Sequence, residues 1–263
     1  MNENLYLGII LVVLSIVGLT AGLRLYQGRY SPHPEFVRKL MHMGSGLVAL
    51  TLPWLFDRSW PVLFLSIVAF VVMLMGRYSR EFKRCVGSAI GSVARESLGE
   101  VYFPLGIGLL FLFSRGDLLL YSIPLLILTF ADAVAALVGV YYGVLRYTTA
   151  EGEKSVEGSA AFFLVAFFSA HIPLLLFTDT GRTESLLIAL FLGLLLMIIE
   201  AAAWRGLDNL FIPTVGFFML KASLEMSIVE LAIHVAVTGI LLIFVLLWHF
   251  KTTLKVQLEG HDV

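Results

Sequence analysis

Long apolar stretches separated by short polar segments fill almost the whole 263-residue chain. A membrane-spanning helix needs about 20 apolar residues. On that basis we expect nine transmembrane spans, at about 5–23, 42–56, 61–76, 101–114, 118–143, 157–177, 184–203, 209–224 and 229–250. The second, fourth and eighth spans are short and are expected to be tilted, broken or partly re-entrant. The pattern predicts an all-α, polytopic integral membrane protein with a single transmembrane domain over residues 1–263.

The composition agrees with this pattern. The chain is 59% hydrophobic and 14% charged, against about 45–50% and about 25% in soluble domains. The formal net charge of −1 indicates no polyanionic partner such as nucleic acid, and the single Cys85 excludes an intrachain disulfide and a cysteine-based metal cluster. Basic residues follow the first apolar run rather than precede it, so we expect a retained span and not a cleaved signal peptide.

The basic residues predict an orientation. With nine spans, alternate loops place 14 Lys and Arg residues on one side and 4 on the other. The smaller set consists of Arg58, Arg115, Arg182 and Lys221. Because cytoplasmic loops carry the excess of Lys and Arg, we expect the N-terminus outside and the C-terminus in the cytoplasm.

Asp132 stands inside the apolar run 118–142. A carboxylate in the body of a membrane helix is costly and marks a functional site by default. Asp132 lies about ten residues from the end of its helix, roughly 15 Å along the axis. We therefore expect either a polar cavity that reaches it or a helix break near Gly139 or Gly143. These glycines share its face and would admit a ligand or, alternatively, a tightly packed helix.

A polar cluster follows this span, at Glu151, Glu153, Lys154, Ser155, Glu157, Gly158 and Ser159. Lys154 and Ser155 are candidate partners for Asp132, which lies 22 residues before Lys154, and for a bound anion. The alternative is a lysine of the cytoplasmic collar beside the N-cap of the next helix. The segment is not a phosphate-binding P-loop, because the required glycine spacing is missing and we expect no strand before it.

Three further polar clusters fall on the same side of the membrane. Glu35, Arg38, Lys39 and His42 are spaced three or four residues apart and would share one helix face. A basic collar that holds lipid headgroups is the alternative for them, although His42 lies deeper than a collar needs. The second cluster, Arg95, Glu96 and Glu100, is typical of a charged membrane interface.

The third cluster precedes the eighth span and contains Glu200, Arg205, Asp208 and Asn209. Asp208 is either a ligand or the N-cap of the next helix. Two aspartates, Asp132 and Asp208, with the Asn209 amide suit Mg²⁺, which favours oxygen ligands and usually bridges to phosphate.

The cationic residues complete this chemistry. Arg38, Lys39 and Lys154 would neutralise phosphate oxygens, and Ser155 would donate a hydrogen bond to one. His42 or a carboxylate would accept a proton from an attacking hydroxyl. At a membrane boundary, these groups predict phosphoryl transfer from a soluble nucleotide to a lipid.

Four segments resemble the polyprenol, dolichol and phytol kinases, grouped with the CTP-dependent diacylglycerol kinases and distantly related to phosphatidate cytidylyltransferases. They lie within about residues 35–213, and the third is the most specific. They are Glu35-Phe-Val-Arg-Lys-Leu-Met-His42; Tyr102-Phe-Pro-Leu-Gly106; Asp132 to Gly139 with Gly143 and then Lys154-Ser-Val-Glu-Gly-Ser159; and Glu200 followed by Asp208-Asn-Leu-Phe-Ile-Pro213.

The resemblance implies a kinase that uses CTP and Mg²⁺ to phosphorylate a long-chain alcohol such as phytol, a polyprenol, dolichol or diacylglycerol. By position, Asp132 and Asp208 would hold the metal, with Asn209 and Glu200 beside them. The nucleotide-binding signature corresponds to Gly139, Gly143, Lys154, Ser155, Glu157 and Gly158. Phytol kinases often carry a second aspartate where this chain has Ala136, which favours the dolichol or diacylglycerol pattern.

Three alternatives remain. A cytidylyltransferase would make a CDP-lipid, although the Arg-rich signature with paired acids is missing. A secondary transporter would use Asp132 and Glu200 as ion sites, but the chain shows no inverted repeat and its polar clusters gather on one side. A lipid-binding scaffold would have no need of Asp132.

Overall fold

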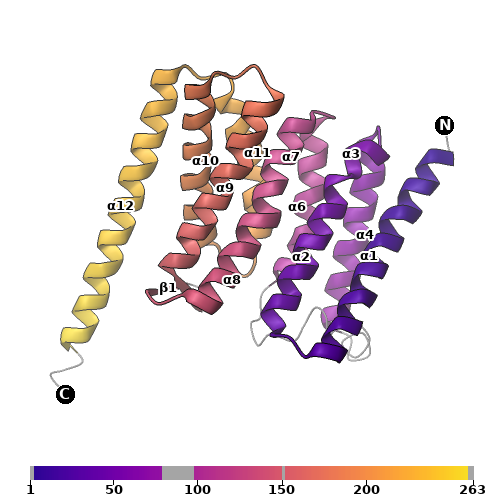
Figure 1. Ribbon diagram of the computed structural model, residues 1–263, viewed down its shortest axis with the longest axis horizontal. Helices are drawn as coiled ribbons and strands as arrows, with labels where there is room; N and C mark the ends of the chain where they lie inside the picture. The colour runs from indigo at the N-terminus through magenta and orange to yellow at the C-terminus, as the bar shows by residue number, and fades with distance from the viewer. Residues whose placement is uncertain (1–2, 79–97, 150–151, 260–263) are drawn as a thin grey trace.

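The computed structural model describes residues 3–78, 98–149 and 152–259 of the chain as a bundle of long helices with one small β-hairpin (Figure 1). The expected all-α architecture is therefore confirmed for this part of the chain, with the hairpin as an addition. The elements are α1 (Glu3–Tyr30), α2 (Pro34–Leu50), α3 (Leu52–Leu55), α4 (Ser59–Tyr78), α6 (Gly99–Ser114), α7 (Leu118–Leu126), the π-helix η1 (Ile127–Ala131), α8 (Asp132–Tyr142), β1 (Arg146–Thr149), β2 (Gly152–Ser155), α9 (Val156–Phe177), α10 (Arg182–Ala202), α11 (Asp208–Ser223) and α12 (Ile228–Glu259).

Within the described residues, each expected span coincides with a helix or a run of adjoining helices. Six of these are long and apolar enough to cross a membrane: α1, α4, the continuous run α7–η1–α8, α9, α10 and α12. The chain is thus a polytopic membrane protein. That α2, α6 and α11 also cross, which would make nine spans, stays a prediction, and so does the orientation.

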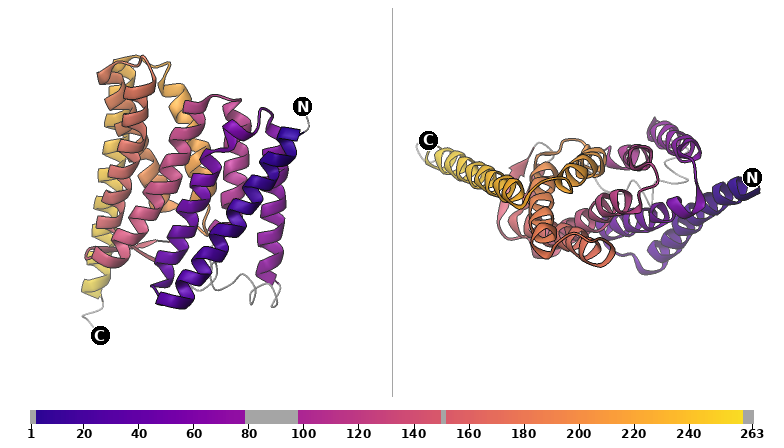
Figure 2. Two further views of the ribbon diagram at one scale, coloured as in Figure 1. Left: turned by 45° about the vertical axis from the view of Figure 1, so that its right-hand side comes forward. Right: turned by 90° about the horizontal axis from the view of Figure 1, so that it is seen from above.

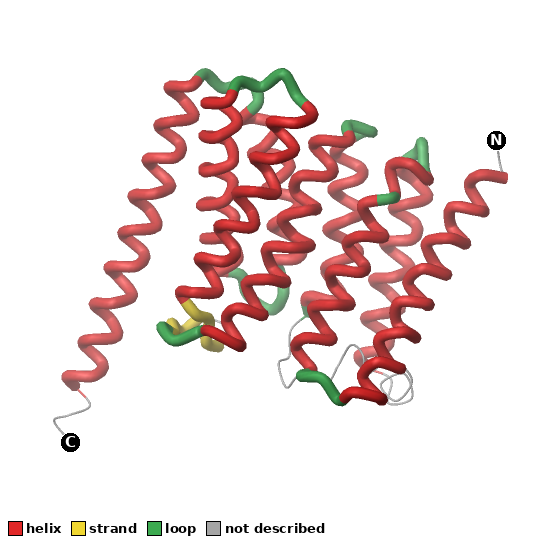
Figure 3. The backbone as a smooth tube through the Cα atoms, viewed as in Figure 1, coloured by secondary structure: helices red, strands yellow, loops and turns green. Residues whose placement is uncertain are grey.

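The helices run alternately up and down, so their connections gather at two opposite ends of the bundle (Figures 1 and 3). One end, drawn at the bottom, carries the connection 31–33, the hairpin and the connection 203–207. The other end carries 115–117, 178–181 and 224–227. We call the first the hairpin end. Every sequence-predicted site residue belongs to an element that begins, ends or passes near it.

The run α7–η1–α8 forms the centre of the bundle. Its apolar window is 56% buried, whereas those of α1 and α12 are 6% and 11% buried. These two helices lie at opposite extremes of the molecule, as Figure 2 shows from two directions. Asp132, the first residue of α8, is therefore in the best-packed helix, and α2, α9 and α11 surround this run.

Of the two positions at which a helix break was the alternative to a polar cavity, Gly139 is wrong, and Gly143 coincides with the end of the helix. The helix α8 continues through Gly139 to Tyr142 and ends at Gly143, its C-cap. The irregular turn lies on the other side of Asp132, where 127–131 form a π-helix. Such single-turn π segments change the hydrogen-bond register of a helix and are frequent at functional sites. The acid is thus reached by side chains from a neighbouring helix and not through a broken α8.

The absence of a strand before Lys154 is also a wrong expectation. β1 and β2 pair antiparallel, with Arg146 opposite Ser155 and Tyr147 opposite Lys154. The segment Arg146–Thr149 contains an aromatic and two β-branched residues, which favour extended backbone. Gly152 has a φ of +119°, a value that favours glycine. The hairpin places Lys154 on a short strand at the hairpin end.

Candidate active site

One face of α2 supplies polar side chains to the central helix. The Nζ atom of Lys39 donates a hydrogen bond to Oδ2 of Asp132 at 2.7 Å. Lys39 and Asp132 are only 3% and 6% exposed, so this is a buried ion pair. Each charge is costly to bury, and removing either partner leaves the other uncompensated. The pair therefore fixes the position of α2 against α8.

His42 lies one turn further along the same face. Its Nε2 atom is 3.0 Å from the carbonyl oxygen of Leu128, in η1, and 3.4 Å from Oδ2 of Asp132. A carbonyl oxygen only accepts, so Nε2 carries a hydrogen, and in the neutral ring Nδ1 has the free lone pair. The ring of Phe103, on α6, lies 4.7 Å away between centroids. His42 is therefore held in one orientation and tautomer.

Arg38 points to Glu35 and not to Asp132. Its guanidinium makes two bonds to the Glu35 carboxylate, at 3.0 and 2.6 Å. It also interacts electrostatically with Asp132 and with Glu100 in the first turn of α6. Of this cluster, Lys39 and His42 turn inward, so the lipid-headgroup collar does not describe them. Arg95 and Glu96 lie outside the described residues.

A second ion pair joins the hairpin to α10. Nζ of Lys154 lies 2.7 Å from Oε1 of Glu200 and also donates to the Glu200 carbonyl. Burial alone would lower the pKa of Lys154, but the Glu200 carboxylate outweighs it, so the pKa lies above its usual value. Lys154 is consequently a permanently charged group directed toward α10. Lys154 does stand beside the N-cap of α9, Ser155, as the collar alternative expected, but its amine is paired with Glu200.

Asp208 and Asn209 begin α11 beside these two pairs. The cap position belongs to Leu207, and Asp208 is the first helical residue, so the N-cap interpretation of Asp208 is wrong. The charges of Asp132, Lys154, Lys39 and Glu200 all act on the Asp208 carboxyl. The two ion pairs and Asp208 therefore form one electrostatic cluster, which we call the two-lysine site: Lys39, Asp132, Lys154, Glu200, Asp208 and Asn209.

The Asn209 side chain has an unused oxygen. Its Nδ2 donates to Oδ1 of Asp208 at 3.3 Å, while its own Oδ1 is buried without a hydrogen-bond partner. A Cβ added at Gly106 would strike the Asn209 carbonyl and lie 3.1 Å from Cγ of Pro213. The glycine of the Tyr102–Gly106 segment thus lets α6 approach α11 closely.

The predicted nucleotide-binding glycines have a packing role. A Cβ at Gly143 would lie 2.8 Å from Cβ and Oγ of Ser155, and one at Gly158 would lie 2.8 Å from the Ala135 carbonyl. A Cβ at Gly139 would also approach the Ser155 oxygen, at 3.2 Å. The small residues of α8 thus bring the start of α9 against it, as the helix-packing alternative expected.

Ser155 is the N-cap of α9, and its Oγ accepts a hydrogen bond from the Gly158 amide at 3.0 Å. Its hydroxyl hydrogen remains free to donate, so capping and anion binding are compatible. Glu157 accepts from the Leu145 amide at 3.0 Å. Its carboxylate joins the residue before the hairpin to α9, and a contact of Glu157 with a nucleotide stays a prediction.

The predicted metal ligands separate into two kinds. Among the described residues, no group of three or more His, Cys, Asp or Glu converges as a metal site. Asp132 and Glu200 each hold a lysine at 2.7 Å and do not fit a cation as they stand. Asp208 and the free Asn209 oxygen do fit Mg²⁺, which takes one or two protein oxygens and completes its shell with phosphate and water.

Sequence reasoning missed several contributors. Tyr147 on β1 bonds the Ser159 hydroxyl at 2.6 Å, burial raises its pKa, and it interacts with Lys154. The aromatic and β-branched residues of Arg146–Thr149 were the available signal for its strand. The Leu128 carbonyl and the Phe103 ring had no signal, because their contacts depend on tertiary packing.

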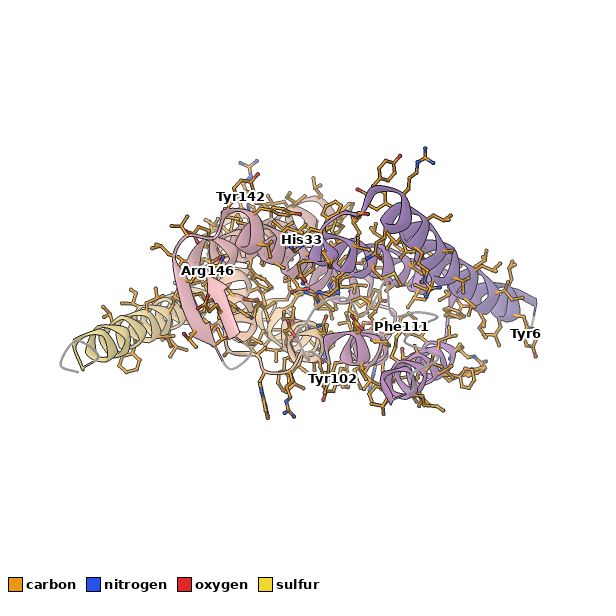
Figure 4. The ribbon with its side chains drawn as sticks, turned by 90° about the horizontal axis from the view of Figure 1, so that it is seen from below. Tyr6, His33, Tyr102, Phe111, Tyr142 and Arg146 are labelled. Carbon is orange, nitrogen blue, oxygen red and sulfur yellow. The ribbon has the colours of Figure 1, made fainter. Side chains whose placement is uncertain are left out.

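Seen from the hairpin end, His33 at the start of α2, Arg146 on β1 and Tyr102 in the first turns of α6 mark three elements that bound this end of the molecule (Figure 4). The two-lysine site draws its residues from α2, α8, β2, α10 and α11, which are distant in sequence.

Comparison with known proteins gives one informative match. The chain is 30% identical over 209 residues to a protein of Synechocystis sp. named phytol kinase, and the alignment covers 78% of this chain and 86% of that protein. No family model matches the chain, and no solved structure does. The aligned length is long enough to include most of the helices described above.

Proposed function

Because the chain belongs to the polyprenol and phytol kinase family, we propose that it transfers the γ-phosphate of CTP to the hydroxyl of a long-chain lipid alcohol. The family makes it a membrane-bound lipid kinase in general terms. The observation that carries the finer proposal is the two-lysine site, in which one buried and one partly buried lysine lie with Asp208 and Asn209 at the polar end of an apolar bundle. From the positive-inside rule we expect this end to face the cytoplasm, where CTP is available.

Lys39 and Lys154 would neutralise the phosphate chain, and the Ser155 hydroxyl would donate to one of its oxygens. Asp208 and Asn209 would hold Mg²⁺ against the phosphates. When bound, Mg²⁺ offsets charge that develops on the transferred group.

The acceptor hydroxyl attacks the γ-phosphorus, the bond to the β-phosphate oxygen breaks, and CDP leaves. His42 would take the hydroxyl proton on Nδ1, since Nε2 is committed to Leu128. Lys39 would remain beside the phosphate that is transferred.

An isoprenoid alcohol is the first acceptor to test, because the similar protein is named a phytol kinase. Ala136, one turn after Asp132, keeps dolichol and diacylglycerol in the same screen.

The test uses purified full-length protein in lipid nanodiscs with CTP labelled at the α- or the γ-phosphate. Phytol, a polyprenol, diacylglycerol and phosphatidate serve as acceptors, and ATP is compared with CTP. A kinase moves only the γ-label into lipid and releases CDP. A cytidylyltransferase moves the α-label and releases pyrophosphate. Transfer to none of these lipids would refute both activities.

Two substitutions examine the site in the same assay. Asp132→Asn and Lys154→Ala should each lower turnover by about 100-fold or more, as loss of a preorganised charged group does. Their matched controls are Asp57→Asn and Lys221→Ala, which make the same changes at exposed positions outside the site. Wild-type turnover in both site variants would refute the assignment.

A further inference from the structure

The two lysines of the site are not free to bind phosphate, because each is already paired. Lys39 is bonded to Asp132 and Lys154 to Glu200, both at 2.7 Å. Both acids were expected to be metal ligands, and both are occupied by a lysine. The same four groups that would bind a polyphosphate and a cation therefore neutralise one another in this structure.

Burial makes this mutual neutralisation necessary. Lys39, Asp132 and Glu200 are all less than 9% exposed, and an unpaired charge at such depth is strongly unfavourable. A phosphate chain can replace the carboxylates as partner of the lysines only if the carboxylates acquire another cation. Asp208 interacts electrostatically with both pairs, so a change of partner in one pair affects the electrostatic potential at the other.

From this geometry we infer that both ion pairs, which we call the two latches, break when their members exchange partners. Lys39 and Lys154 leave their carboxylates for phosphate oxygens, and Asp132 and Glu200 then become ligands for a divalent cation. The inference rests on the proposed function. It adds that polyphosphate and cation cannot bind independently, since each lysine must leave its acid before either ligand is fully bound. The coupling makes the site selective for the cation complex of the nucleotide over either component.

Single-ligand titrations test the exchange without any reaction. The probes are Mn²⁺ alone, followed by its electron paramagnetic resonance, and inorganic tripolyphosphate alone in EDTA, followed by calorimetry. Both use the full chain in nanodiscs. Removing one member of a pair should increase affinity for the ligand of the member that remains. Lys39→Met should raise Mn²⁺ affinity, and Asp132→Asn should raise metal-free tripolyphosphate affinity, each by about tenfold, within the usual range of coupling between sites.

Controls separate exchange from general electrostatics. Arg146→Met breaks the exposed pair with Glu153 on the same end of the molecule, 3.8 Å between charged atoms, and should change neither affinity more than about twofold. The double variant Lys39→Met/Asp132→Asn removes both charges and should lose the gain in Mn²⁺ affinity. The second latch provides independent variants, Lys154→Met and Glu200→Gln, should the first fail to fold.

The outcomes are distinct. If wild-type protein binds no tripolyphosphate under any condition, the proposed function fails and this inference with it. If wild type binds both ligands but no single variant increases either affinity, the pairs are only structural and the exchange alone is refuted. A gain of similar size in Arg146→Met also refutes it, because the effect would then be one of overall charge.

Discussion

Gly46 is where α2 meets the π-helix, and replacing it tests how the site is held together. A Cβ built at Gly46 would collide with Oγ1 and Cγ2 of Thr129 and lie 2.8 Å from its Cβ, where ordinary contacts begin at 3.4 Å. Thr129 is fully buried, so it cannot turn aside. In Gly46→Ala the two helices must therefore separate by about 0.6 Å or more.

The expected cost follows from two opposing effects. Overpacking a close helix contact costs about 1–3 kcal/mol. Alanine in a helix is more favourable than glycine by about 1 kcal/mol. We expect a net loss of up to about 2 kcal/mol. The control is Gly18→Ala in α1, where no atom lies within 4 Å of the new methyl, and that variant should gain up to about 1 kcal/mol.

The separation should also reduce activity, because α2 carries Lys39 and His42. A 1 Å misplacement of reacting groups costs about 100-fold, so a smaller shift should cost about tenfold in turnover. Reversible unfolding in mixed detergent micelles measures stability, and lipid phosphorylation measures turnover. Gly46→Ala that is as stable and as active as Gly18→Ala would contradict the reasoning.

A second variant identifies the colliding group. Thr129→Ala removes Oγ1 and Cγ2, and its hydroxyl is buried without a partner, so the single change should be nearly neutral. Combined with Gly46→Ala, it should recover about half or more of the lost stability. If the two effects simply add, the Gly46 methyl is accommodated elsewhere.

Three other predictions concern named contacts. In Glu200→Gln, no carboxylate offsets the effect of burial, so the pKa of Lys154 falls. Tripolyphosphate affinity of this variant should then decline between pH 8 and pH 10. In the wild type Lys154 stays protonated, so the affinity should hold within about twofold. Ser155→Ala removes the cap of α9 and should destabilise the protein by about 1 kcal/mol in the unfolding assay, while Ser155→Asp should retain most of the stability. Tyr121→Phe removes a buried 2.8 Å bond to the Ala49 carbonyl and should lower the free energy of unfolding by about 1–3 kcal/mol with no change in tripolyphosphate affinity.

The helices were predictable because the membrane imposes their length and polarity. The run 118–142, for instance, appears in the structure as α7–η1–α8 with the same bounds. The π-turn inside it was not predictable, since no local residue pattern distinguishes 127–131 from ordinary helix. It depends on packing against α2, where Gly46 and His42 contact Thr129 and the Leu128 carbonyl. The hairpin was missed because four-residue strands give a weak signal.

Which residues belong to the site was more predictable than which of them pair with one another. Spacing on α2 correctly put Lys39 and His42 on one face, and a buried acid at Asp132 required a partner. The expected partner was Lys154, the nearest lysine along the chain. The actual partner is Lys39, 93 residues earlier, because α2 and not the hairpin packs beside the start of α8.

This change of partner alters the interpretation of the intramembrane acid. If Asp132 had been an unpaired ligand waiting for a cation, its burial at 6% exposure would have been difficult to sustain in the absence of ligand. Lys39 removes that difficulty and introduces another requirement, since Asp132 can act on a ligand only after Lys39 has moved. The same reasoning applies to the other ion pair that interacts with Asp208, Glu200 with Lys154. The buried carboxylate that was expected to mark a metal site is, in this structure, the ion-pair partner of a lysine that we propose binds phosphate.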